Sequence, residues 1–87
     1  MMNKQLLNEL LTAVNEQIAT ENPKEAKTVY ETLLARGLDE KKAKEKIAKV
    51  IYQESINIMT TQEPFSRDRY VHNLLALLDD VEAEIEF

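Results

Sequence analysis

The sequence predicts an all-α protein, in which four amphipathic helices pack as a small bundle and form one domain, residues 1–87. Large apolar residues recur at spacings of three and four, which is typical of one face of a helix. The chain has one glycine and two prolines, too few turn residues for a β-rich fold of 87 residues. Hydrophobic residues make up 44% and charged residues 31% of the chain, a composition typical of folded rather than disordered domains.

A first helix is expected over residues 3–21, because the residue before Pro23 is disfavoured in the helical conformation. Its apolar face consists of Leu6, Leu7, Leu10, Leu11, Val14 and Ile18. We expect this helix to complete a four-helix bundle with a three-helix core that begins at residue 23. In the alternative, the first helix pairs with a partner's helix, which would make a homodimer.

A second helix is expected over residues 23–36 and a third over residues 40–59. The joint between them carries the strongest local signal in the chain. Gly37 is the only glycine and follows Arg36, where a left-handed residue commonly ends a helix. Asp39 is a favourable N-cap for the helix that follows. These residues therefore predict a tight turn between two helices.

A fourth helix is expected over residues 67–86, with Ser66 as its N-cap, after a polar segment that contains Pro64. Its apolar stripe consists of Tyr70, Leu74, Leu77, Leu78, Val81 and Ile85. Four helices of this kind joined by short loops predict a compact bundle.

Charge is unevenly distributed along the chain. Residues 24–49 carry eight Lys or Arg against five Asp or Glu, a net charge of +3, whereas residues 50–87 carry two against eight, a net charge of −6. The whole chain has a net charge of −5, which argues against nucleic acid as its main partner, because binding nucleic acid depends on neutralising phosphates.

Several features bear on the cellular context. The absence of cysteine excludes disulfides and thiolate metal sites. No apolar run approaches the ~20 residues that cross a bilayer. The N-terminus lacks the basic and apolar segments of a signal peptide. We therefore expect a cytoplasmic protein that does not associate with membranes.

A set of residues between positions 22 and 77 forms a recognisable pattern: Asn22-Pro23, Val29-Tyr30, Leu33-Leu34, Gly37, Ala43, Ile47, Glu54, Phe65 and Arg69-Tyr70. The pattern resembles a family of small, uncharacterised, all-helical bacterial proteins. The resemblance implies a helical fold and a bacterial source, and it transfers no catalytic residue.

Glu54 is the candidate buried polar residue. Counting 100° per residue, it falls within the arc of Ile47, Val50, Ile51 and Ile58, so we expect its side chain to point into the core. A buried carboxylate needs donors, and the candidates are Tyr30, Tyr70 and Arg67. The favoured interpretation is a hydrogen-bonded group that fixes the helix register. The alternatives are a ligand-binding carboxylate in a pocket, or a glutamate at the rim of the core.

Lys42, Lys46 and Lys49 line one exposed face of the third expected helix. Together with the joint at Gly37, this arrangement resembles a helix-turn-helix in outline, and a basic second helix is how such motifs meet DNA. Lysine is also a common solvating residue on any exposed helix, and we favour that interpretation.

No constellation of residues predicts catalysis, a cofactor or a metal site. His72 has only Asp68 nearby on its helix, whereas zinc requires three or four ligands. Neither Ser55 nor Ser66 has a spacing that links it to the histidine. The leading hypothesis is a non-enzymatic protein-interaction or self-association module. The alternatives are a nucleic-acid-binding regulator that uses the lysine face and a small-ligand binder around Glu54.

Overall fold

The residues that the structure describes fold into four α-helices: α1 (Lys4–Thr20), α2 (Lys24–Ala35), α3 (Glu40–Thr61) and α4 (Arg67–Ile85). The computed structural model describes the backbone of residues 3–62 and 64–85, and the side chains of these residues as far as position 79. No strand occurs in these two ranges, which confirms the all-α prediction. The helix limits differ from those expected by at most two residues, and the expected last residue of the fourth helix, 86, lies outside the described residues. The largest difference is at the end of α3, which continues until Gln62 adopts a left-handed conformation with φ of 59°.

The starts of α1, α3 and α4 each have a side chain that caps the helix. Asn3 Oδ1 accepts a hydrogen bond from the Leu6 amide (2.7 Å), and Asp39 Oδ1 accepts one from the Lys42 amide (2.8 Å). Ser66 Oγ accepts one from the Arg69 amide (3.2 Å). These short polar residues satisfy amides that have no partner within their own helix. The helix α2 begins differently, after the cis peptide bond Asn22–Pro23.

The joint between α2 and α3 has the geometry that the sequence predicts. Gly37 has φ of +102°, a conformation that L side chains rarely adopt. Its amide donates to the Leu34 carbonyl (3.0 Å), and the Leu38 amide donates to the Leu33 carbonyl (3.1 Å). This pair of bonds is the Schellman motif, which satisfies the last carbonyls of α2 and turns the chain into α3.

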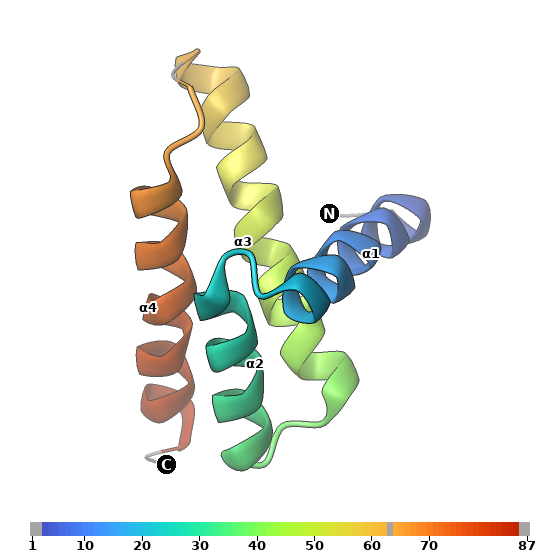
Figure 1. Ribbon diagram of the computed structural model, residues 1–87, viewed down its shortest axis with the longest axis vertical. Helices are drawn as coiled ribbons and strands as arrows, with labels where there is room; N and C mark the ends of the chain where they lie inside the picture. The colour runs from blue at the N-terminus through green and yellow to red at the C-terminus, as the bar shows by residue number, and fades with distance from the viewer. Residues whose placement is uncertain (1–2, 63, 86–87) are drawn as a thin grey trace.

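The helices surround one core. Figure 1 shows α2 and α4 running side by side, with α1 crossing α3 on the other side of the molecule, and α1 also packs against the start of α2. Leu10 and Val14 of α1 are buried in this core, so α1 completes the bundle within its own chain. The alternative, in which the first helix serves to pair with a partner, is therefore not supported. No helix in the described ranges is long and apolar enough to span a membrane.

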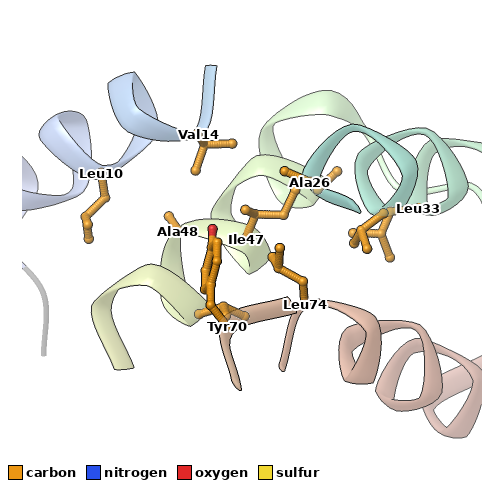
Figure 2. Packing of buried hydrophobic residues seen from close by; sticks show 11 residues of the cluster. Leu10, Val14, Ala26, Leu33, Ile47, Ala48, Tyr70 and Leu74 are labelled. Atoms are coloured by element: carbon orange, nitrogen blue, oxygen red, sulfur yellow. The ribbon is translucent and has the colours of Figure 1, made fainter. Parts of the chain in front are cut away.

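The buried cluster draws residues from every helix: Leu10, Val14, Ala26, Val29, Leu33, Ala43, Ile47, Ala48, Val50, Tyr70 and Leu74. Figure 2 shows Ile47 and Leu74 facing each other near its middle and the ring of Tyr70 standing up from α4 with its hydroxyl directed towards α1. The core therefore brings one phenolic group and, beside it, Glu54 into largely apolar surroundings, and these two groups define the candidate site.

Candidate functional site

Glu54 is the only charged residue that is buried among the described side chains, with 3% of its surface exposed. It lies on the core face of α3, as the helical spacing predicts. Arg69 of α4 supplies its donors: Nε lies 3.1 Å from Oε1 and 3.0 Å from Oε2, and Nη2 also donates to Oε2. The arrangement joins α3 to α4 through a fork of charge-assisted hydrogen bonds.

The three donors expected for Glu54 each hydrogen-bond to another residue, so this prediction is wrong. The Tyr30 hydroxyl donates to Glu40 (3.1 Å), at the exposed start of α3. The Tyr70 hydroxyl donates to Gln17 (2.6 Å), and Arg67 Nη1 donates to Asn22 (3.1 Å).

Arg69, rather than Arg67, contacts Glu54 for a simple geometric reason. Two residues apart on a helix, these arginines flank the apolar stripe of α4 on opposite sides. Arg67 faces the joint between α1 and α2, and Arg69 faces α3. The sequence indicates only weakly that Arg69 lies near the core, because it is adjacent to the buried Tyr70. Helical periodicity does not show which neighbouring helix Arg69 or Arg67 faces.

Tyr70 is the second polar group of the site. Burial raises the pKa of its hydroxyl to about 12, and the hydrogen bond to Gln17 acts in the opposite direction. The pKa of Tyr30 is also raised, by loss of hydration and by its neighbour Glu40. Tyr70 is therefore a neutral hydrogen-bond donor at neutral pH, and it ties α4 to α1 across the end of the core.

A hollow of about 210 Å³ opens beside these groups between α1, α3 and the start of α4. We name it the Phe65 hollow, and it is lined by Gln17, Ile51, Glu54, Ser55, Ile58, Phe65 and Tyr70. The ring centroids of Phe65 and Tyr70 are 5.9 Å apart. Phe65 keeps 57% of its surface exposed, and Met59 keeps 79%. Both oxygens of Glu54 already accept hydrogen bonds from Arg69, so the chemistry that the hollow offers is mainly apolar contact.

The three lysines of the candidate basic face lie together, as their spacing predicts. A second hollow, of about 520 Å³, opens at the joint between α2 and α3. It is lined by the three lysines and by Arg36. We name it the lysine hollow, and its other lining residues are Gly37, Leu38, Asp39 and Glu45. The sequence did not predict Arg36 at this site. Its Nη1 donates to the Leu78 carbonyl, which fixes the guanidinium between α4 and the joint.

The remaining polar candidates have ordinary structural environments. Ser66 caps α4, and Ser55 Oγ donates to the Ile51 carbonyl within its own helix (3.0 Å). His72 is exposed on α4. Among the described side chains, no group of three His, Cys, Asp or Glu residues could hold a metal ion.

Comparisons with known proteins give no relative for this chain. No protein-family model, no curated protein and no solved structure matches it. Any functional assignment therefore depends on the two hollows and their surroundings.

Proposed function

We propose that the protein is a non-enzymatic self-association module, in which two copies meet through the Phe65 hollow and the apolar side chains around it. The observation that carries this proposal is the exposure of Met59 and Phe65, 79% and 57%, beside an apolar recess. Single exposed apolar residues are ordinary, but two large ones next to a hollow are typical of an interaction surface.

The occupant that fits this surface is a second copy of the chain. In a two-fold dimer the same patch serves both partners, so it must carry both a projection and a recess. Met59 projects one helical turn after Ser55, which lines the hollow, so projection and recess lie side by side on α3. A two-fold axis near Ser55 would place the Met59 side chain of each copy in the hollow of the other.

The test is the solution mass over a concentration series, measured by light scattering behind size exclusion. We expect the wild-type chain to dimerise. Burying a methionine contributes about 1.5–3 kcal/mol, and the interface contains two, so Met59→Gln is expected to weaken the dimer by about 100-fold or more. Leu75→Gln is the matched control, because Leu75, 42% exposed, is the other large apolar residue on the surface of the described part of the chain and does not line the hollow.

Two outcomes would contradict the proposal. One is a wild-type chain that remains monomeric at the highest concentrations that can be reached, which would leave a different protein as the occupant of the hollow. The other is a dimer that Met59→Gln and Leu75→Gln weaken equally, which would place the contact on another face. Circular dichroism of each variant shows whether the fold is retained, since both substitutions are at exposed positions.

A further inference from the structure

Met59 is the only methionine among the described residues, and with 79% of its surface open it is the most exposed of their large apolar side chains. It belongs to the last turns of α3 and lies one helical turn beyond Ser55. The chain has no cysteine, so no thiol competes for oxidants that attack sulfur. In the described part of the chain, the thioether of Met59 is therefore the group that peroxides oxidise most readily.

The Phe65 hollow suits the reduced side chain of a methionine. Two aromatic rings, those of Phe65 and Tyr70, line it with their centroids 5.9 Å apart. A thioether sulfur makes favourable contacts with aromatic rings, and the unbranched methionine side chain adapts to an irregular recess. In the proposed dimer, these contacts form between Met59 of one copy and the two rings of the other.

The same hollow has few groups that could pair with an added polar oxygen. The Tyr70 hydroxyl already donates to Gln17 Oε1 (2.6 Å). The Ser55 hydroxyl donates to the Ile51 carbonyl (3.0 Å), and the Glu54 carboxylate, paired with a guanidinium, offers only acceptors. The amide nitrogen of Gln17 is the remaining donor among the lining side chains. A polar oxygen moved from water into this recess is therefore poorly satisfied, which costs free energy.

We propose that oxidation of Met59 to its sulfoxide by hydrogen peroxide is a reversible switch that dissociates the dimer, an inference that rests on the self-association proposed above. The sulfur lone pair forms a bond to one peroxide oxygen while the O–O bond breaks, and the released hydroxide takes up a proton to become water. The sulfur is oxidised and the peroxide is reduced by the same pair of electrons. A methionine sulfoxide reductase reverses the step with electrons from a dithiol, which becomes a disulfide as the oxygen leaves as water.

The switch acts on the monomer. The sulfur of Met59 is open to solvent in the single chain and is covered by the second copy in the dimer, so the oxidant reaches it when the dimer has come apart. The sulfoxide oxygen is well hydrated in the monomer and poorly satisfied in the hollow, so an oxidised chain does not re-associate with its former affinity. Two measurable consequences follow: oxidation is slower at higher protein concentration, and the solution mass falls as oxidation proceeds.

The test is treatment of the purified protein with hydrogen peroxide over a concentration series. Peptide mass spectrometry gives the fraction of Met59 sulfoxide, and light scattering behind size exclusion gives the mass. We expect the sulfoxide to weaken the dimer by about 100-fold or more, as for Met59→Gln, because each places a polar group in both hollows. Treatment with a methionine sulfoxide reductase and dithiothreitol is expected to restore the dimer.

Met59→Leu is the matched control. It keeps an apolar side chain of similar volume at this position, and it also keeps Met1 and Met2. We expect this variant to form the dimer and to be insensitive to peroxide. Circular dichroism of the oxidised wild-type protein is expected to show unchanged helix content, because Met59 is exposed and lies outside the core.

The possible contrary results are distinct from one another. A wild-type dimer whose affinity is unchanged by full oxidation of Met59 would overturn the switch and leave the self-association standing. A Met59→Leu dimer that peroxide dissociates as strongly would assign the effect to another methionine. Equal oxidation rates in the monomer and the dimer would show that Met59 is not covered. Loss of helical signal on oxidation would show unfolding rather than dissociation. A wild-type chain that is monomeric before any oxidation would overturn the self-association itself, and the switch with it.

Discussion

Both carboxylate oxygens of Glu54 in α3 accept hydrogen bonds from the Arg69 guanidinium in α4, although the Glu54 side chain is 4% exposed and that of Arg69 is 31% exposed. Because Glu54 is buried and Arg69 is partly exposed, the stability of the fold depends unequally on these two side chains. Loss of the arginine would leave an uncompensated charge in the core, whereas loss of the glutamate would leave a guanidinium that can still reach water. The ion pair therefore fixes how α4 meets α3 more than it adds stability.

Replacing Arg69 by methionine is expected to lower the free energy of unfolding by about 3 kcal/mol, because Glu54 would remain buried without its donors. Urea denaturation at neutral pH measures this. Arg67→Met is the matched control, and we expect it to cost roughly 1 kcal/mol or less because its hydrogen bond to Asn22 is exposed. Equal losses in the two variants would contradict the assignment of Arg69 as the partner of Glu54.

The double variant Glu54→Leu/Arg69→Met tests whether the pair itself is needed for stability. Replacing a buried ion pair by apolar residues of similar volume is often neutral or stabilising, so we expect the double variant to recover most of the ~3 kcal/mol lost in Arg69→Met. A double-mutant cycle in urea gives the coupling between the two side chains. Losses that simply add would show that the two residues do not act together.

Tyr70→Phe is expected to cost about 1 kcal/mol at neutral pH, because it removes the 2.6 Å hydrogen bond to Gln17 while the ring stays in the core. The comparison variant is Tyr30→Phe, whose hydrogen bond to Glu40 is exposed and whose loss we expect to have a smaller effect. Thermal or urea unfolding of the two variants measures the difference. A Tyr70→Phe variant as stable as the wild type would show that the Gln17 contact contributes nothing.

The raised pKa of Tyr70 predicts a loss of stability in alkaline solution. The folded-state pKa is about 12 and the unfolded value is 10.0, so between these values the folded state keeps a proton that the unfolded state has lost. Stability from this group is therefore complete below pH 10 and falls as the pH rises towards 12. Tyr70→Phe should remove this component, and it should also remove the phenolate absorbance that appears last in an alkaline titration. Identical alkaline unfolding of the two proteins would contradict the prediction.

Gly37→Val is expected to destabilise the protein by ~1–2 kcal/mol or more, since a β-branched residue tolerates a φ of +102° poorly. No neighbour lies within 4 Å of the added Cβ, so the cost arises from backbone strain rather than from a steric clash. Gly37→Asn is the control, because asparagine accepts left-handed conformations more readily than valine does. Equal costs for both variants would show that strain at this position is not the cause.

Much of this structure follows from local sequence signals. The apolar spacing, the caps at Asp39 and Ser66, and the glycine at position 37 each act within a few residues, so they predict four helices and their limits to within two residues. The burial of Glu54 also follows, because its angular position on one helix decides it.

Three contacts do not follow from such signals: those of Glu54 with Arg69, of Tyr70 with Gln17, and of Arg36 with the Leu78 carbonyl. Each joins residues that are distant in sequence and depends on which side of a helix faces which neighbour. Helical periodicity distinguishes the buried side of a helix from its exposed side, but it does not show which helix packs against each edge of the buried face. The sequence by itself determined the helices and their buried faces, because those depend on short-range spacing. Only the tertiary structure decided which polar groups meet and where the two hollows open, because those depend on how the helices cross.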